Sequence, residues 1–363
     1  MVEALEAALE RFAGRRTAQG DPLRHRFAVL PSRQEPRCLL PLGDSRTTLE
    51  GFRVYTPYAF GERLRKSLLS QIVKTGLSSW AMHSLYVGEP LGLKALVTNV
   101  TGERNPAFAM LLGTPGKYRK LTIQVMRAGG ATLGYLKLGL TKPAGDRVRH
   151  EAAILEELSR LRPYIPAVLY AGEWQDSYLL FQSPVQGRPG PSELSTKHMA
   201  FLERLADLQR TVRSGLRVAD EVAARWNAVT WRCDWRWQQL GAAVLSAARR
   251  DLQNVTVPCG LWHGDFAPWN TRVRDGQLSA FDWESCEADM PLGWDAFHFS
   301  VQVASRLKKG WRTKFDLAQT PGARGLFLLY LLFTLGRSLD ERAESNQDLD
   351  YRRRALVSEL AVN

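Results

Sequence analysis

The stretch of sequence that decides the fold is HGDFAPWN at residues 263–270, and the segment DWE follows it, beginning at Asp282. Between the two lies Asp275-Gly276, flanked on each side by a half-apolar run. An Asp-Gly pair in this setting is typical of a two-residue β-hairpin turn. Counting outward from that turn sets Asn270 beside Asp282, at the ends of adjacent strands.

This hairpin would bring together side chains suited to phosphoryl transfer. Asn270 and Asp282 offer the oxygen ligands that Mg²⁺ prefers, and Mg²⁺ often takes only a few protein groups together with phosphates. Asp265, in the loop just before, can accept the proton of an incoming hydroxyl. A base Asp, a metal-binding Asn and a metal-binding Asp form the constellation of kinases. We therefore expect Asp265 to be catalytic and Asn270 and Asp282 to bind the metal.

The bulk composition is that of an ordinary globular protein. The chain has 363 residues, enough for two domains or one large bilobal unit, with 45% hydrophobic and 24% charged residues. The sequence contains no run of about eighteen apolar residues, so no transmembrane helix is predicted. The acidic N-terminus does not resemble a signal peptide. The four cysteines are widely scattered, which suits a reducing cytoplasm and argues against a structural zinc site. We expect a cytoplasmic protein.

The net charge of +12 is the unusual bulk feature. It is consistent with a nucleic-acid partner, an anionic membrane surface, an acidic substrate, or simply solvated Arg-rich faces. No basic run is interleaved with aromatic residues as a single-strand binding groove requires, and no DNA-binding motif is present.

Residues 1–105 carry no catalytic motif and are interpreted as an N-terminal extension of unknown role. Its opening residues have helical apolar spacing (Leu5, Ala8, Leu9 and Phe12), and short strands are predicted at 26–30 and 37–40. An amphipathic helix with a basic face is predicted at 62–75, with an apolar stripe of Leu64, Leu68, Leu69, Ile72 and Val73. That helix could contact a membrane or an acidic partner, or it could be a solvated surface helix.

Residues 106–187 are expected to form a nucleotide-binding first lobe. Two predicted strands flank the loop from Gly113 to Lys120, a hairpin tip that could lie over phosphates. The residues expected to contact the nucleotide there are Gly113, Thr114, Gly116 and Lys117. The spacing matches neither a Walker loop nor G-x-G-x-x-G, so a simple turn remains the alternative.

The next strand and helix strengthen the prediction of a nucleotide site. Lys137 lies mid-strand on the face opposite Leu136 and Leu138. Glu151 lies within the apolar stripe of the following helix, where a carboxylate needs a cationic partner. A strand Lys paired with a helix Glu orients the nucleotide phosphates in kinases.

A Pro/Gly-rich link at 182–187 is interpreted as the hinge between lobes, with Gln182 and Ser183 near the adenine edge. Beyond it, residues 188–363 are expected to form a helical lobe for catalysis, metal and acceptor binding. Its predicted helices are Met199–Val212, Trp231–Leu252, Trp294–Leu307, Leu326–Leu339 and Tyr351–Leu360. Strands first and helices after predict a bilobal α+β fold.

These motifs together resemble the aminoglycoside phosphotransferase and choline kinase group within the protein-kinase-like fold. His263-Gly264-Asp265 with Asn270 resembles the catalytic loop, and DWE resembles the segment that replaces D-F-G. The resemblance implies a small antiparallel-sheet first lobe, a larger helical second lobe, and Mg²⁺-dependent transfer from ATP, or GTP, to a hydroxyl of a small molecule. It also implies that Asp295 braces the catalytic loop, and His263 is interpreted as a brace too.

The acceptor is left open by the sequence. Trp231 and Trp235 fall four apart on a predicted helix and could stack on a sugar ring or pack in the core. Glu284 could assist the metal, serve an acceptor site or make a structural hydrogen bond. With Glu287 and Asp289 it could also form an acidic pocket for a polycationic antibiotic, whereas the basic balance favours a sugar or an anionic glycan intermediate.

Two rival functions remain open as well. A pseudokinase-type nucleotide-binding or scaffold protein would bind nucleotide without turnover. A basic nucleic-acid-associated protein would bind DNA or RNA with a steep salt dependence.

Overall fold

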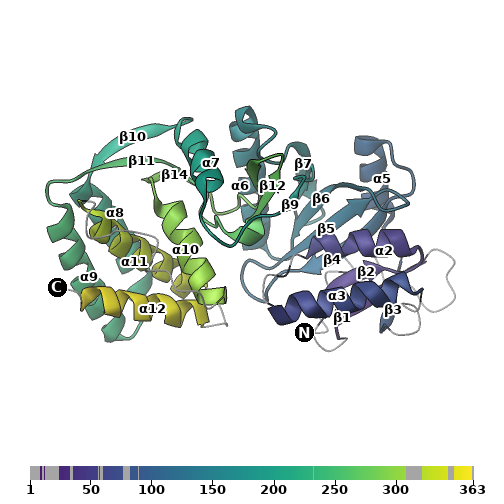
Figure 1. The fold of residues 1–363 in the computed structure, drawn as a ribbon, viewed down its shortest axis with the longest axis horizontal. Coiled ribbons are helices and arrows are strands. Elements are labelled where there is room, and N and C mark those ends of the chain that lie inside the picture. Colours follow the sequence, from purple (N-terminus) through teal and green to yellow (C-terminus); the bar gives the residue numbers. More distant parts are fainter. Residues whose placement is uncertain are drawn as a thin grey trace. The chain divides into compact units, whose positions relative to one another are not determined.

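The computed structural model describes residues 9, 12, 24–32, 36–55, 57, 60–76, 82–88, 90–231, 233–307, 321–341 and 347–361. The chain divides into two compact units, Met1–Gln186 and Gly187–Asn363 (Figure 1). The division falls within the Pro/Gly-rich link at 182–187. The first unit is built on an antiparallel sheet and the second is mostly helical, so the predicted kinase-like α+β fold is confirmed.

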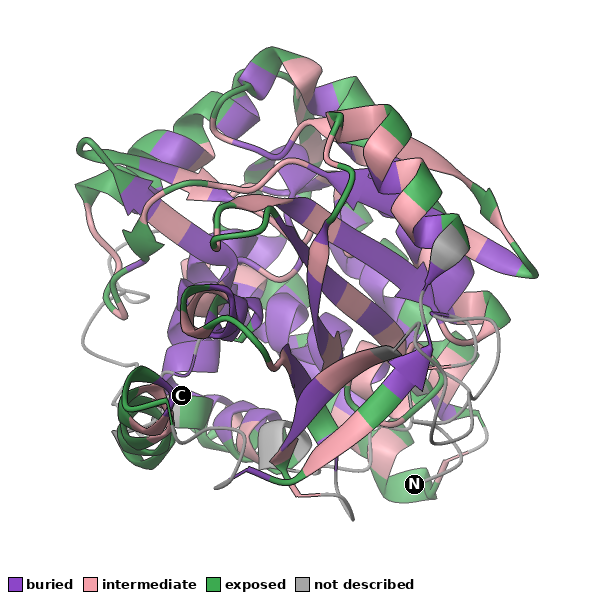
Figure 2. Cartoon of the chain, turned by 90° about the vertical axis from the view of Figure 1, so that its right-hand side faces the viewer, coloured by how far each residue is buried: buried purple, intermediate pink, exposed green. Residues whose placement is uncertain are grey.

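The first unit contains one eight-stranded antiparallel sheet, in the order β3-β1-β2-β4-β5-β6-β8-β7. Its strands are β1 (Arg24–Pro31), β2 (Pro36–Pro41), β3 (Ser84–Gly88), β4 (Ala107–Leu112), β5 (Lys120–Met126), β6 (Thr132–Gly139), β7 (Val168–Trp174) and β8 (Ser177–Gln182). Buried residues run along these strands (Figure 2). Among the five neighbouring strands from β4 to β7, the central one is β6, which contains Lys137.

Strands from residues 1–105 extend this sheet at the β4 edge. β2 pairs with β4 through Cys38 opposite Leu111, and the strands predicted at 26–30 and 37–40 are confirmed as parts of β1 and β2. Phe27 shares one apolar core with Phe108. Leu9 and Phe12 are helical, whereas Leu5 and Ala8 of the predicted opening helix lie outside the described residues.

The predicted basic helix is α3 (Phe60–Lys74), which contacts α2 (Ser45–Gly51). The first unit also contains the short 3₁₀ turn η1 (Phe52–Val54) and α5 (Leu91–Thr101). The predicted burial of the apolar stripe of α3 is wrong in the N-terminal part of the helix, because Leu64 and Leu68 are 52% and 59% exposed. Burial is confined to the C-terminal half, where Val73 lies in the core. Lys66 donates to the carbonyls of Phe52 and Tyr55 at 2.7 Å, so this Lys has a local structural role.

Helix α6 (Lys142–Glu157) follows β6 and ends in the 3₁₀ turn η2 (Leu158–Leu161). Thr141 caps it by accepting a hydrogen bond from the Ala144 N–H, and Pro143 suits its first turn because that position has no helical acceptor for an N–H. Its buried face includes Val148, Ala152 and Leu155, with Glu151 among them. The helix therefore presents a carboxylate to the interior of the first unit.

The second unit contains helices α7 (Thr196–Ala206), α8 (Gly215–Thr230), α9 (Trp235–Leu252), α10 (Trp294–Leu307), α11 (Ala323–Glu341) and α12 (Gln347–Leu360). Two small sheets accompany them, β10-β11-β14 and β13-β12-β9. Their strands are β9 (Arg188–Pro189), β10 (Arg210–Ser214), β11 (Thr256–Trp262), β12 (Thr271–Arg274), β13 (Gln277–Ala280) and β14 (Glu287–Pro291). No described helix is long and apolar enough to cross a membrane.

Helix predictions in this unit are confirmed at α10, α11 and α12 and wrong at two boundaries. The helix predicted to reach Val212 ends at Ala206, because residues 210–214 pair with β11 instead. The helix predicted from Trp231 begins at Trp235, after Asp234, whose side chain accepts the Arg236 N–H as an N-cap. Trp231 closes α8, a helix that the sequence did not predict.

Candidate active site

The β12–β13 hairpin has the predicted register, with Val273 opposite Leu278. Asp275 and Gly276 both have positive φ (50° and 78°), as a type I′ turn requires. Beyond the ladder, the Phe281 N–H donates to the Asn270 carbonyl at 3.0 Å. The hairpin thus joins the backbone of Asn270 to the residue immediately before Asp282.

Gly264 allows the catalytic loop to pack against the segment that follows the hairpin. Its φ is +80°, a region that L side chains rarely adopt, and a Cβ there would lie 2.1 Å from the Ser285 carbonyl oxygen. Both the backbone conformation and the close approach exclude a side chain. The loop between β11 and β12 and the DWE segment are therefore in backbone contact at this point.

Asn270 orients its amide toward Asp265. Its Nδ2 donates to the Asp265 carbonyl at 2.9 Å and to Asp265 Oδ2 at 2.7 Å. The short 3₁₀ turn η3 (Pro268–Asn270) holds the Asn in place, and its side chain is buried. Because the amide nitrogen is used in this way, the amide oxygen is the atom left to bind a cation.

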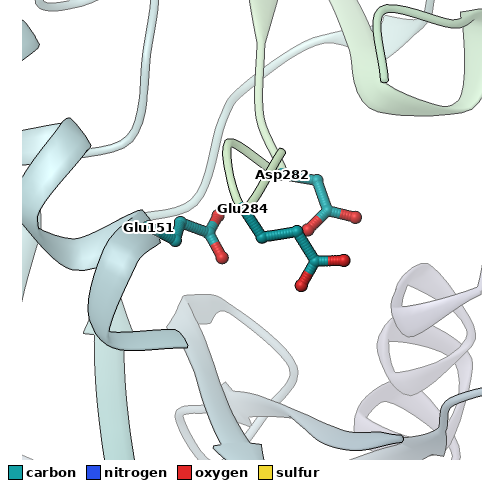
Figure 3. Close-up of side chains that lie close together, drawn as sticks. All are labelled: Glu151, Asp282 and Glu284. Carbon is teal, nitrogen blue, oxygen red and sulfur yellow. The ribbon is translucent and has the colours of Figure 1, made fainter. Parts of the chain in front are cut away.

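Asp282 and Glu284 supply two further oxygen donors. Their carboxylate oxygens lie within 4.8 Å of each other, and both side chains are drawn in Figure 3, which also labels Glu151 of α6. Asp282 has a φ of 70°, an uncommon conformation for a residue with a side chain and one that clusters at functional sites. Trp283 between them is fully buried. This all-oxygen donor set fits Mg²⁺ better than a softer metal.

His263 and Asp295 anchor the loop between β11 and β12. Asp295 accepts the backbone N–H of His263 at 2.9 Å and that of Gly264 at 3.3 Å. His263 Nδ1 accepts the Asp265 N–H at 3.3 Å, so its Nε2 is the nitrogen that donates to the Phe281 carbonyl at 3.2 Å. These contacts support the bracing role expected of both residues, since they join the loop to α10 and to the hairpin end.

Acid should destabilise this brace. Burial lowers the pKa of His263 from 6.5 to about 4, and nearby Asp265 and Asp282 only partly oppose that. The unfolded chain therefore binds the proton more readily between pH 6.5 and 4, so stability rises with pH across that window, by roughly 3 kcal/mol in all. Thermal unfolding from pH 7.5 to 4.5 should show a shallower pH dependence in His263→Gln than in the wild type. An equal slope would show that His263 is not the titrating group.

The predicted ion pair of Lys137 and Glu151 is present. Lys137 Nζ lies 2.6 Å and 2.7 Å from the two oxygens of the Glu151 carboxylate. The side chains are only 5% and 0% exposed, so their mutual attraction offsets part of the solvation that each charge has lost. The ammonium is thereby held between β6 and α6.

The predicted phosphate loop connects β4 to β5. The Gly113 N–H donates to the Lys120 carbonyl at 2.8 Å, while Thr114, Gly116 and Lys117 are exposed. Thr141, the N-cap of α6, donates to the Lys117 carbonyl. The loop therefore presents exposed backbone and a cationic side chain, and it is tied to the helix that carries Glu151.

Gln182 and Ser183 lie where β8 ends. Gln182 is buried, and its Oε1 has no hydrogen-bond partner. The Ser183 N–H donates to the Ala167 carbonyl, and its hydroxyl accepts the Ala167 N–H, both at 2.8 Å. The backbone N–H of Ser183 is thus already used and is not available to an adenine edge.

The two tryptophans of the predicted acceptor site are exposed. Trp231 and Trp235 are 63% and 58% exposed, and they belong to the end of α8 and the start of α9, not to one helix. Core packing, the alternative to stacking, is therefore wrong for this pair. The neighbouring Trp226 is the tryptophan that is buried.

Two of the three carboxylates that could have formed an acidic pocket are already in ion pairs. Glu287 binds Arg225 at 2.6 Å. Asp289 accepts hydrogen bonds from Arg213 and Thr211, and these contacts lower the pKa of its carboxyl group. The negative charge of each of these two carboxylates is therefore already compensated by an arginine.

Sequence reasoning missed His298 and Tyr330. His298 Nε2 lies 3.1 Å from Asp265 Oδ1, and Tyr330 Oη lies 3.2 Å from His298 Nδ1. The spacing of His298 three residues after Asp295 on one helix was a usable signal, because such residues share a face. Tyr330 lies within the apolar run of α11, where no sequence pattern points to it.

Comparison with known proteins supports the kinase-like interpretation. A model of the phosphotransferase enzyme family matches residues 134–295. A search of curated protein sequences finds no match.

Similar solved structures include a thermostable mutant of aminoglycoside phosphotransferase APH(4)-Ia in its apo form. The identity is 16% and the TM-score 0.50, over 74% of this chain and 98% of that one. Its ternary complex with AMP-PNP and hygromycin B has 15% sequence identity to this chain and a TM-score of 0.51, with the same coverage of both chains. The choline kinase LicA from Streptococcus pneumoniae has 13% sequence identity and a TM-score of 0.48, over 75% of this chain and 99% of that one. At these identities the first two matches establish the fold alone.

Residues 134–295 contain the Lys137–Glu151 pair, the loop of Asp265 and Asn270, and the carboxylates of Asp282 and Glu284. Through this segment, the chain is similar to the phosphotransferase enzyme family.

Proposed function

We propose that this protein is a small-molecule kinase that transfers the γ-phosphate of ATP, or of GTP, to a hydroxyl group. The observation that carries the proposal is the joint position of Asp265 and Asn270, linked by a 2.7 Å hydrogen bond at the end of the hairpin that leads to Asp282. A half-exposed carboxylate beside a pair of oxygen donors has the composition of a phosphoryl-transfer site.

Each residue would have a distinct role. Asp265 would accept the proton of the acceptor hydroxyl, and its side chain is 37% exposed and so reachable. Asn270 and Asp282 would hold Mg²⁺, with Glu284 as a further ligand. The metal would neutralise charge on the transferred phosphoryl group. Lys137, oriented by Glu151, would bind the α- and β-phosphates, and the loop of Gly113, Thr114, Gly116 and Lys117 would cover them.

The acceptor we propose is neutral or anionic, such as a sugar or a glycan intermediate. A polycationic antibiotic would need unpaired carboxylates, whereas Glu287 and Asp289 are engaged by arginines. Burial and the Asp282 carboxylate act to raise the pKa of Asp265, whereas His298 and the cationic Arg306 act to lower it; Arg306 lies 4.9 Å from the Trp269 ring in the catalytic loop. An Arg next to an aromatic ring suits a polyhydroxylated or acidic ligand.

We also place the reaction in the cytoplasm. The four cysteines are all thiols, a state that a reducing compartment maintains. A pseudokinase is the less favoured alternative, because the Lys, the base Asp, the Asn and the metal Asp are all present.

An acceptor screen tests this function. ATP and GTP consumption would be measured with Mg²⁺ against neutral sugars, sugar phosphates, nucleotide sugars and aminoglycosides, with Asp265→Asn as the blank. We expect turnover with a neutral or anionic acceptor. Nucleotide binding without turnover by any acceptor class would instead favour the pseudokinase, and turnover with aminoglycosides alone would refute the acceptor class.

The exposed tryptophan pair gives a separate prediction. Trp231→Ala and Trp235→Ala should change stability by only about 0.5 kcal/mol, because both rings are exposed. If they stack on the acceptor, its KM should rise about fivefold, at the roughly 1 kcal/mol that a stacking contact contributes. The measurement is KM for acceptor and for nucleotide in each variant. An unchanged acceptor KM would remove both residues from the acceptor site.

A further inference from the structure

Asp265 receives hydrogen bonds from two sides. Asn270 Nδ2 lies 2.7 Å from Oδ2, and His298 Nε2 lies 3.1 Å from Oδ1. His298 comes from α10 and is buried, whereas Asn270 comes from the hairpin end. With one donor on each oxygen, the carboxylate cannot rotate about its terminal bond without losing a contact.

The hydrogen-bond pattern defines which nitrogen of His298 carries the proton. An ionised carboxylate can only accept, so Nε2 must donate to Asp265. Tyr330 Oη lies 3.2 Å from the other ring nitrogen, Nδ1. If that nitrogen is unprotonated, the Tyr330 hydroxyl donates to it, and every polar atom in the chain from Tyr330 to Asp265 has a partner of the right kind.

The surroundings keep both groups neutral. Burial lowers the pKa of His298, and Arg352 and Arg337 act in the same direction, although Asp265 opposes them. Burial raises the pKa of Tyr330 to about 12. Arg337 belongs to α11 and Arg352 to α12, so the positive charges come from two further elements. A neutral imidazole with a proton on Nε2 is the form that these charges favour.

We propose that His298 is a positioning residue for the catalytic carboxylate, and that Tyr330 selects the tautomer in which His298 donates to Asp265. This inference rests on the proposed kinase function of Asp265. His298 fixes the plane of the carboxylate, so that a remaining lone pair faces the acceptor hydroxyl. It touches neither substrate nor nucleotide in this role.

Kinetics of matched variants test the proposal. His298→Leu removes the donor, and we expect kcat to fall about 100-fold with little change in nucleotide KM, since small misplacements of a reacting group cost about that much. His298→Gln can present an N–H near the position of Nε2 and should recover most of that loss. Tyr330→Phe keeps the ring, removes the hydroxyl and should lower kcat about tenfold through the tautomer. A wild-type kcat in His298→Leu, or no rescue by Gln, would overturn the proposal.

His198 provides the matched control. It is also fully buried and packs against Phe266 in the same loop, with ring centroids 5.9 Å apart, but its Nδ1 bonds to Ser195 and not to Asp265. His198→Leu should therefore lower the unfolding temperature much as His298→Leu does, with kcat within a few-fold of wild type. An equal fall of kcat in both variants would show a general packing effect and would count against positioning.

NMR of ¹⁵N-histidine-labelled full-length protein tests the tautomer without any acceptor. The chain has six histidines, and the His298 signals are those lost in His298→Gln. We expect the Nε2–H tautomer in the wild type and a mixture of tautomers in Tyr330→Phe. The Nδ1–H tautomer in the wild type would overturn the proposal. The Nε2–H form in a protein that turns over no acceptor would reject the kinase function and leave this hydrogen-bond chain intact.

Discussion

Asp265→Asn should lower kcat by about 10³-fold while nucleotide affinity stays near the wild-type value. The amide that replaces the carboxylate has almost the same shape but cannot take up the acceptor proton. It also presents an N–H toward one of two donors, so the contact with Asn270 or with His298 is weakened. The measurements are single-turnover and steady-state phosphorylation of the acceptor, with calorimetric titration of a non-hydrolysable ATP analogue.

Asp275→Asn is the matched control for this change. It makes the same substitution in the turn of the same hairpin, where the Asp275 side chain is 86% exposed. Its φ of 50° is one that Asn tolerates well, so the hairpin should keep its register. We expect full activity from this variant. Near-wild-type turnover in Asp265→Asn would show that another group, or no group, acts as the base.

Glu151→Gln should strongly destabilise the first unit. It removes the negative charge 2.6 Å from the buried Lys137 ammonium, and breaking a buried ion pair by neutralising one partner costs about 3–5 kcal/mol. Nucleotide binding should weaken as well, because the ammonium is no longer held in one position. Chemical denaturation and nucleotide titration of the same preparation would measure the two effects.

Two further variants separate stability from nucleotide binding. Glu173→Gln breaks an exposed pair with Arg149, with side chains 64% and 52% exposed, and should cost less than about 1 kcal/mol. The double variant Lys137→Met with Glu151→Leu removes both buried charges and should restore much of the stability. It should not restore nucleotide affinity. Recovery of both properties would show that Lys137 has no role toward phosphates.

Several parts of the site could be predicted from the sequence because their geometry is local. The Asp-Gly turn fixes the register of its own hairpin, so the spacing from Asn270 to Asp282 follows from counting residues. Strand alternation and the helical period likewise place Lys137 and Glu151 on faces that can meet. In each case a few consecutive residues contain all the information.

Other features depend on partners that are distant in the sequence. The sequence predicts helix through Val212, but residues 210–214 form β10 because β11, more than forty residues later, offers a strand edge. The strands of residues 24–41 likewise join the sheet only because β4 is available to pair with β2. Local propensity is weak beside such pairing, and sequence periodicity does not reveal which edge is open.

The sequence by itself determined the fold class and the hairpin, and it predicted Asp265, Asn270, Asp282, Lys137 and Glu151 as a phosphotransferase set. Only the tertiary structure decided what surrounds the base. Tyr330 lies in an apolar helix with no polar pattern, and it meets His298 because α10 and α11 pack together. A hydrogen bond between side chains from separate helices depends on that packing, and packing is set by all the buried residues at once.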